Sequence, residues 1–397
     1  MDYRLFFIEL AIGIGKFFLH PLFYLGIVLS ILLGYFRVKR ERKDFHIRVQ
    51  DGWFEFRTYL FKGLLLGTVF SSVVVLLGLI VPFSWIVTTG LLMLLFSLFL
   101  KPSLLSPVYT AGIAYLLLIG FDYFPVELPM FHSFLTGYSS FLPNAALAVG
   151  LFLLIEGILI IRNGSKNTSP KAMTSNRGLK VGLHEQKRLW LVPFVLLIPE
   201  GALTSPFDFW PVFPIDETSF SFLLVPFWIG FGQQVRTTLP DVGIRKTGKQ
   251  VIGLSIPVIV IASLGYVFPI FSLISVTLAI IVRPIIALKQ YLQDKSKKYY
   301  FSKNVPGIVI LDIIPGSPAE KMNLKIGEII RTVNGIHVLN ELEYYAALQK
   351  NRAFCKLEVI DENGENRFVN QALYEGEHHE LGVIFIDEGT KWSMEVS

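Results

Sequence analysis

Residues 313–335 read IIPGSPAEKMNLKIGEIIRTVNG and carry the clearest local signals in the chain. After a Pro-Gly turn, Ser317 can cap a short helix, and Pro318 suits the first position of that helix. The β-branched run 329–333 predicts a strand, and Asn334-Gly335 predicts a tight turn directly after it. The order of strand, capped helix, strand and tight turn indicates a small α+β domain.

The neighbouring segments extend this pattern. The sequence predicts a buried strand at 307–314, a helix at 341–350 capped by Asn340, a hairpin formed by 354–360 and 366–370, and an apolar strand at 381–386. Together with the quoted stretch, these segments resemble a bacterial PDZ domain.

The resemblance implies a peptide-binding groove, because PDZ domains bind extended peptides by strand addition. The loop that receives the peptide carboxylate usually precedes the strands found here, but the basic and aromatic segment 297–303 does not match it. We therefore expect a permuted domain, in which 380–386 supplies the carboxylate loop and the pairing strand and helix 341–350 forms the opposite wall. Alternatively, 381–386 is an edge strand that closes the sheet. The candidate peptide-binding residues are Leu381, Gly382, Val383, Ile384, Leu342 and Tyr345.

The rest of the sequence is unusually apolar. Of the 397 residues, 52% are hydrophobic and 17% are charged, whereas soluble domains carry about 25% charged residues. Residues 1–300 contain 27 Lys and Arg against 16 Asp and Glu, and residues 301–397 contain 9 against 15. This distribution predicts a basic membrane part followed by an acidic soluble domain.

Nine apolar stretches approach the length of about 20 residues that a helix needs to cross a bilayer. Because backbone amides in lipid must be satisfied locally, we expect an α-helical polytopic bundle of eight or nine helices before the PDZ-like domain. The two weakest stretches, 189–204 and 219–235, are short and contain Pro193, Pro199 and Pro226. The stretches lie at 5–36, 60–81, 83–100, 104–121, 141–161, 189–204, 219–235, 251–267 and 270–288.

The loops between these stretches alternate in charge. The segments 37–62, 162–188, 236–249 and 289–298 are basic, whereas the connections near 82, 122–140, 205–218 and 268–269 contain no Lys or Arg. By the positive-inside rule, the basic loops and the C-terminal domain are cytoplasmic. A crossing at 17–36 makes nine spans, whereas a break of 5–36 at Pro21 leaves eight.

We therefore expect five parts. They are an N-terminal apolar segment (1–36) interrupted at Lys16–Pro21, a basic cytoplasmic loop (37–59), a multi-span region (60–288), a basic linker (289–302) and a cytoplasmic PDZ-like domain (303–390). The basic residues from Arg37 to Arg48 could bind anionic lipids or could serve as a topology signal.

Among the charged residues within apolar stretches, the candidates are Glu156, Glu200 and Arg283, with Glu9 and Lys16 near the start of the chain. Charged residues at membrane depth are often functional. We expect instead that Glu156 lies at the interface, that Arg283 snorkels near a helix end, and that Glu200 caps a short helix near the outer surface. Pro- and Gly-interrupted segments near 199–201 and 230–232 also allow a transporter.

The sequence argues against an enzyme. A zinc-protease motif His-Glu-x-x-His is incomplete at both His184 and His379, and no Gly-x-Ser-x-Gly or phosphate-binding loop occurs. Cys355 lies in an apolar strand and is expected in the core. We therefore expect binding without catalytic residues, metal, cofactor or nucleic acid.

The whole chain resembles the MinJ family of division-site topological determinants of Gram-positive rods. The resemblance is strongest at 17–48 and 300–388, and its most telling segments are GYFRVKRERKDFHIRV at 34–49 and HHELGVIFIDEG at 378–389. It implies a polytopic scaffold at the septum and poles that bridges a DivIVA-like curvature-sensing protein to MinD-like inhibitors and other divisome components, and a homo-oligomer is compatible with this role. Two alternatives stay open: a non-catalytic PDZ-containing regulator of a membrane protease, and a transporter with a regulatory tail.

Overall fold

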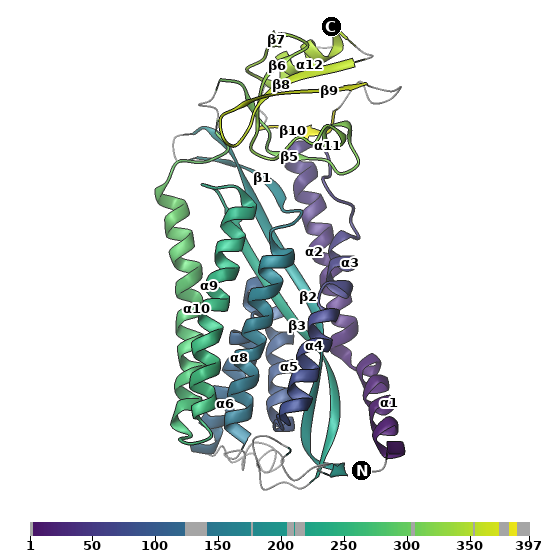
Figure 1. Cartoon of the computed structure of the whole chain (residues 1–397), viewed down its shortest axis with the longest axis vertical. Helices are drawn as coiled ribbons and strands as arrows, with labels where there is room; N and C mark the ends of the chain where they lie inside the picture. The colour runs from purple at the N-terminus through teal and green to yellow at the C-terminus, as the bar shows by residue number, and fades with distance from the viewer. Residues whose placement is uncertain are drawn as a thin grey trace.

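The computed structural model describes residues 3–123, 141–175, 178–204, 210, 219–302, 306–351, 354–372 and 381–386. An elongated membrane part contains α1 to α10 and a three-stranded sheet, and a small α+β domain sits at one end of it (Figure 1). The predicted helical membrane bundle followed by a PDZ-like domain is confirmed.

Among the described residues, five helical segments are long and apolar enough to cross a membrane. They are α2 (Pro21–Phe45), α3 with α4 (Phe54–Phe61 and Leu64–Leu77), α8 (Leu142–Leu159) with the turn that follows it, α9 (Pro240–Leu264) and α10 (Ile270–Ser296). Two shorter apolar helices, α5 (Phe83–Ser97) and α6 (Ile113–Tyr123), pack against them. Large apolar side chains are exposed on α2, α5, α9 and α10, as expected of surfaces that contact lipid.

The N-terminal apolar segment divides at His20. Helix α1 (Tyr3–Leu19) ends there, and the His20 side chain accepts a hydrogen bond from the Leu22 N–H at 3.2 Å, which caps α2. Pro21 occupies the first position of α2, where its missing N–H costs nothing. Helix α2 alone is long enough to cross the membrane. The break at His20 therefore favours the alternative in which the N-terminal apolar segment contributes one membrane crossing.

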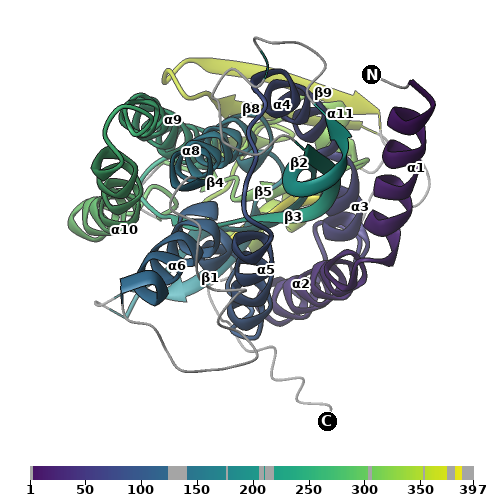
Figure 2. The same ribbon diagram turned by 90° about the horizontal axis from the view of Figure 1, so that it is seen from below.

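The segments 189–204 and 219–235 are strands, so the prediction that they are spanning helices is wrong. Strands β2 (Lys180–Thr204) and β3 (Ser219–Val235) form a long antiparallel hairpin, and β1 (Ser169–Thr174) pairs with the start of β2. Seen from below, the hairpin lies inside a ring of helices (Figure 2). Trp190, Phe194 and Trp228 are buried at its centre.

Prolines favour the hairpin over helices. Inside a helix, Pro193 and Pro226 would each remove a hydrogen bond, whereas in the hairpin they lie directly opposite each other. The Val195 N–H donates to Ser71 Oγ at 2.9 Å, so it points away from β3. The backbone N–H and C=O groups of residues two apart in a strand are directed to the same side of that strand. The Pro193 nitrogen therefore also faces away from β3, and its missing N–H removes no hydrogen bond between β2 and β3.

Glycines allow α4 to cover this outer edge of β2. A Cβ atom on Gly67 would lie 2.4 Å from the carbonyl oxygen of Pro193, and one on Gly63 would lie 2.0 Å from that of Leu191. Small residues permit such close backbone approach in membrane bundles. The sheet edge is therefore enclosed by protein, as non-helical backbone at membrane depth requires.

This packing makes a testable prediction. We expect Gly67→Ala to lower the free energy of unfolding by about 2 kcal/mol, because the added methyl group meets backbone atoms that cannot rotate aside. The control is Gly253→Ala in α9, where a Cβ atom would meet nothing within 4 Å. Thermal unfolding of the detergent-solubilised protein measures both variants, and equal stability of the two would argue against the contact between α4 and β2.

Glu156 on α8 and Arg283 on α10 form an ion pair inside the bundle. Arg283 Nη2 lies 2.7 Å from Glu156 Oε1, and Ser106 Oγ donates to Glu156 Oε2 at 2.6 Å. The side chain of Arg283 is 7% exposed and that of Glu156 is 0% exposed, so the expectation that they reach the interface separately is wrong. Each charge compensates the other, which a buried charge requires. The side chain of Glu200 lies outside the described residues.

The C-terminal domain contains the predicted kinds of element, in the predicted order. Strands β4, β6, β8 and β9 form one sheet with β7 paired to β6, and β5 pairs with β10. The predicted single strand 307–314 is two strands, because the Ile310 N–H bonds to the Glu328 carbonyl while the Leu311 N–H bonds to the Ile384 carbonyl. The elements are β4 (Ile308–Val309), β5 (Asp312–Ile313), α11 (Pro318–Lys321), β6 (Ile329–Val333), β7 (Ile336–His337), α12 (Glu341–Gln349), β8 (Phe354–Ile360), β9 (Asn366–Ala372) and β10 (Val383–Ile384).

The local signals of this domain act as predicted. Ser317 Oγ accepts a hydrogen bond from the Glu320 N–H, and Asn340 Oδ1 accepts one from the Glu343 N–H at 2.9 Å. The turn at Asn334-Gly335 has φ values of 51° and 82°, which are typical of a tight hairpin turn.

Candidate interaction site at the PDZ-like domain

Strand β10 has one edge paired with β5 and the other directed away from it. The carbonyls of Gly382 and Ile384 accept hydrogen bonds from the N–H groups of Ile314 and Leu311, both at 2.8 Å. Because successive backbone groups of a strand point to opposite sides, the N–H and C=O of Val383 face away from β5. Such an edge can receive a peptide strand.

Gly382 begins this strand in a conformation that favours glycine. Its φ is +79°, and a Cβ atom there would lie 2.3 Å from Ser317 Cβ. The chain can therefore turn closely past the start of α11, and the Leu381 carbonyl accepts a hydrogen bond from the Ala319 N–H at 2.9 Å. A Gly-containing turn before the pairing strand is the arrangement that the predicted carboxylate loop requires.

Helix α12 contacts Phe385, the residue that follows β10. The rings of Tyr344 and Phe385 meet edge to face with centroids 4.8 Å apart, so these two residues join the helix to the strand. Sequence reasoning missed both of them, because the pair of tyrosines at 344 and 345 does not itself show which ring faces inward. Of the predicted wall residues, Leu342 is 54% exposed and Tyr345 packs partly against the domain core.

The C-terminal domain rests on the membrane part through an apolar contact. A polar contact accompanies it: His184, near the start of β2 in the membrane part, has its Nε2 2.9 Å from the carbonyl oxygen of Leu311 in the C-terminal domain. The Gly182 N–H donates to the Phe301 carbonyl at 3.1 Å. Ile384 belongs both to β10 and to this contact, so β10 has a fixed place on the membrane part. The buried side chains of the contact are Val49, Phe301, Val309, Leu311 and Ile384.

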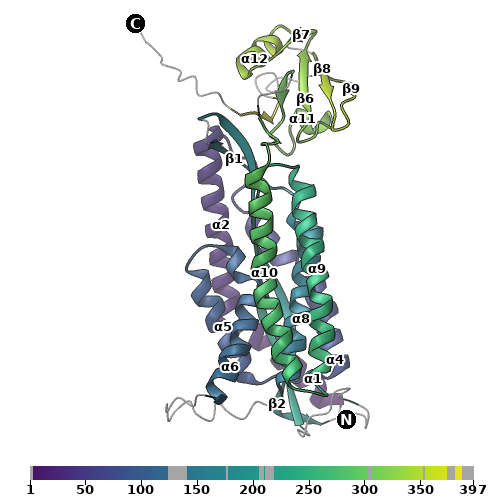
Figure 3. The same ribbon diagram turned by 90° about the vertical axis from the view of Figure 1, so that its left-hand side faces the viewer.

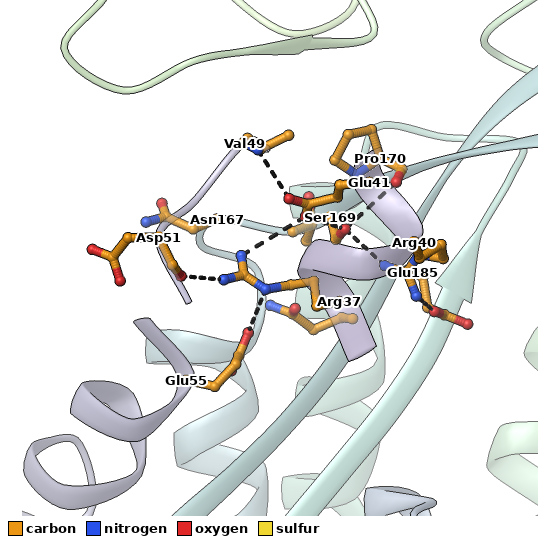
Figure 4. A network of polar contacts seen from close by, with 12 residues as sticks. Arg37, Arg40, Glu41, Val49, Asp51, Glu55, Asn167, Ser169, Pro170 and Glu185 are labelled. Carbon is orange, nitrogen blue, oxygen red and sulfur yellow. Dashed lines mark hydrogen bonds and ion pairs between the residues drawn. The ribbon is translucent and has the colours of Figure 1, made fainter. Parts of the chain in front are cut away.

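A polar network beneath the domain ties α2 to the sheet (Figure 4). Both carboxylate oxygens of Glu55 accept hydrogen bonds from Arg188 at 2.6 Å, and Arg37 Nε lies 3.4 Å from Glu55. Glu41 accepts hydrogen bonds from Ser169 Oγ at 2.6 Å and from the Val49 N–H at 2.9 Å. These contacts hold the segment between α2 and α3 under the C-terminal domain.

The basic residues from Arg37 to Arg48 differ in how far they are exposed. Arg37 is buried and paired internally, and its Nη2 donates to the Asp51 carbonyl at 2.8 Å. The segment is therefore not a uniform cationic surface. Its exposed basic residues are Lys39, Arg42, Lys43 and Arg48.

Two of the residues considered for catalysis, Cys355 and His184, are built into the fold, and His379 lies outside the described residues. Cys355 is buried in β8, as predicted for a core residue, and burial raises the pKa of its thiol to about 12. His184 Nδ1 lies 2.8 Å from Thr168 Oγ1 while its other nitrogen contacts Leu311. Within the described part of the chain, no three His, Cys, Asp or Glu side chains gather as a metal site would need.

Comparison with known proteins agrees with this organisation. The PDZ domain family matches residues 309–360. The chain is 39% identical over 381 residues to the cell division topological determinant MinJ of Bacillus subtilis (strain 168), covering 96% of each chain. It is 24% identical over 369 residues to the probable cell division topological determinants MinJ of Lacticaseibacillus paracasei and Lacticaseibacillus casei (strain BD-II), covering 93% of this chain and 96% of theirs. The chain therefore belongs to the MinJ family of cell division topological determinants.

Proposed function

We propose that this protein is a membrane scaffold for division-site selection. It bridges a DivIVA-like curvature-sensing protein at the poles and septum to MinD-like inhibitors, and so restricts Z-ring assembly to mid-cell. The observation that carries this proposal is the second edge of β10, which pairs with no other strand among the described residues and which the Ile384 contact holds at a fixed place on a membrane-embedded body. Membership of the MinJ family supports the division role.

We place the PDZ-like domain in the cytoplasm, where these partners act. The C-terminal domain follows α10 and its basic end, and β2 begins at the same end of the bundle (Figure 1). Basic loops are favoured on the cytoplasmic side of a membrane. The groove and the exposed basic residues then face the same compartment.

Several weak contacts on one membrane-held body act together. A partner that engages the groove between β10 and α12 meets neighbouring cytoplasmic surfaces at high effective concentration, without any additional strong contact. A scaffold of this kind needs no catalytic residue. It needs only that its binding surfaces be held within reach of one another, which the contact between the two parts provides.

Cell imaging tests this function. We expect a fluorescent fusion at the native locus to collect at the septum and poles, and we expect deletion of the gene to give long filaments or minicells, because Z-ring placement is lost. An unrelated polytopic protein with the same fluorescent tag serves as the control and should label the membrane evenly. An even signal from this protein, with cells of ordinary length after deletion, would instead support a protease regulator or a transporter.

A further inference from the structure

A cavity of about 330 Å³ opens beside the polar network, between α2, the end of α5 and the sheet. Figure 3 shows α2, β1 and α5 along one side of the molecule. Its lining combines apolar side chains with charged side chains from α2, α3, β1 and β2. The residues that decide its chemistry are Leu33, Phe36, Leu100, Arg40, Lys171 and Lys187.

The cavity lies where the apolar surface of the bundle gives way to basic residues. Phe36 is 46% exposed and is followed directly by Arg37, and the exposed Leu98 and Phe99 lead through Leu100 to Lys101. Aromatic and aliphatic side chains followed by Lys and Arg mark the boundary between the hydrocarbon core and the headgroups. A molecule in this cavity would therefore contact both acyl chains and the polar layer.

The lining of the cavity holds more positive than negative charge. One carboxylate, that of Glu185, faces three cations: Arg40 pairs with it directly, and the ammonium groups of Lys171 and Lys187 lie 3.7 and 3.6 Å away. Gln234 Nε2 also donates to Glu185, at 2.9 Å. The other acidic residue of the lining, Glu55, is already bound by Arg188.

The two lysines consequently keep hydrogen-bond donors for a ligand. An ammonium group has three donors, and contacts at 3.6 to 3.7 Å are longer than hydrogen bonds. Burial lowers the pKa of Lys171, and the positive charges of Arg40 and Lys187 lower it further, so a bound anion would relieve this repulsion. Arg40 Nε is buried and has no hydrogen-bond partner among the described residues.

We propose that this cavity binds the phosphate group of an anionic phospholipid from the cytoplasmic leaflet. Lys171 and Lys187 contact the phosphate, and Arg40 holds Glu185 out of its way. The acyl chains lie along Phe36 and Leu100. Basic pockets beside membrane helices recognise lipid headgroups in this manner.

The test compares lipid affinities of the full-length protein in detergent micelles by native mass spectrometry. We expect wild-type protein to prefer phosphatidylglycerol over phosphatidylcholine, and K171Q/K187Q to bind phosphatidylglycerol about thirtyfold more weakly. Glu185 keeps Arg40 and Gln234 as partners in this variant, so the fold is retained. The matched control is K297Q/K298Q, which removes the same charge from exposed positions after α10 and should leave the affinity within about twofold.

Three results would overturn the proposal. Equal weakening in K171Q/K187Q and in the control would show that general surface charge attracts the lipid. Equal binding of phosphatidylcholine would remove the requirement for an anionic lipid. Displacement of phosphatidylglycerol by inorganic phosphate in the millimolar range would assign the cavity to a soluble anion, since a lipid whose chains contact Phe36 should resist this competition.

Discussion

Replacing Arg188 by Met is expected to lower the free energy of unfolding by about 3–5 kcal/mol. Arg188 forms an ion pair with Glu55, and both side chains are buried, with 1% exposure for Arg188 and 5% for Glu55. The substitution leaves the Glu55 carboxylate buried without its two hydrogen bonds from Arg188, with Arg37 Nε 3.4 Å away, and it also removes hydrogen bonds to the carbonyls of Lys166 and Asn167. The contact with Arg37 should keep the loss near the lower end of this range.

Thermal unfolding in detergent measures this effect. The matched control is Arg245→Met, because Arg245 pairs with Asp241 where both side chains are about half exposed, and exposed pairs contribute at most about 1 kcal/mol. The double variant R188M/E55M should recover much of the lost stability, since it leaves no carboxylate buried without its partner. A single R188M variant as stable as the control would show that the pair does not hold α3 against β2.

Replacing Leu342 by Glu is expected to weaken peptide binding roughly hundredfold, because a charge in the groove wall must be desolvated against the peptide. Leu342 is 54% exposed, so the variant should remain folded. The ligands are C-terminal peptides selected from a displayed library on the full-length protein, and fluorescence anisotropy measures their affinities. The prediction includes a requirement for a free carboxylate on the selected peptides.

The control for this variant is Phe368→Glu, which places the same charge on an exposed aromatic position of β9, in the other sheet of the domain. It should bind the selected peptides as the wild type does. Comparable affinities for L342E, F368E and the wild type would favour the alternative in which 381–386 only closes the sheet. Point substitution is preferable to truncation before Glu380, because Leu381, Val383 and Phe385 belong to the domain core and their removal would disturb folding.

The C-terminal domain could be predicted in detail because its signals are local. Ser317, Asn340 and the Asn334-Gly335 turn each act on backbone groups within a few residues. The prediction that 381–384 forms a strand able to pair with a peptide depends on the family resemblance. The residues around 381–384 carry no signal that would place β10 beside β5. The contribution of Tyr344 and Phe385 depends on a contact between segments far apart in the sequence.

The hairpin inside the bundle could not be separated from helices by hydropathy, since a buried strand and a buried helix are both continuously apolar. The available signal was the placement of Pro193 and Pro226, which suits two facing strand positions better than two helix interiors. The Glu156–Arg283 pair joins residues 127 positions apart. A charge in an apolar stretch does not reveal such a partner, and for this reason the sequence alone predicts Glu156 at the interface and Arg283 near a helix end.

The side of the membrane that carries the PDZ-like domain tests the central claim most directly, because a scaffold for cytoplasmic division proteins must present its groove inside the cell. A Glu365→Cys variant places a thiol at an exposed position in the turn between β8 and β9. Its reaction with a membrane-impermeant maleimide reports on which side of the membrane the domain lies. The native Cys355 should stay silent, since it is buried with a raised pKa. Val267→Cys, exposed between α9 and α10 at the opposite end of the bundle, is the control. We predict that intact cells label V267C alone and that E365C reacts only after the membrane is permeabilised; labelling of E365C in intact cells would contradict the account.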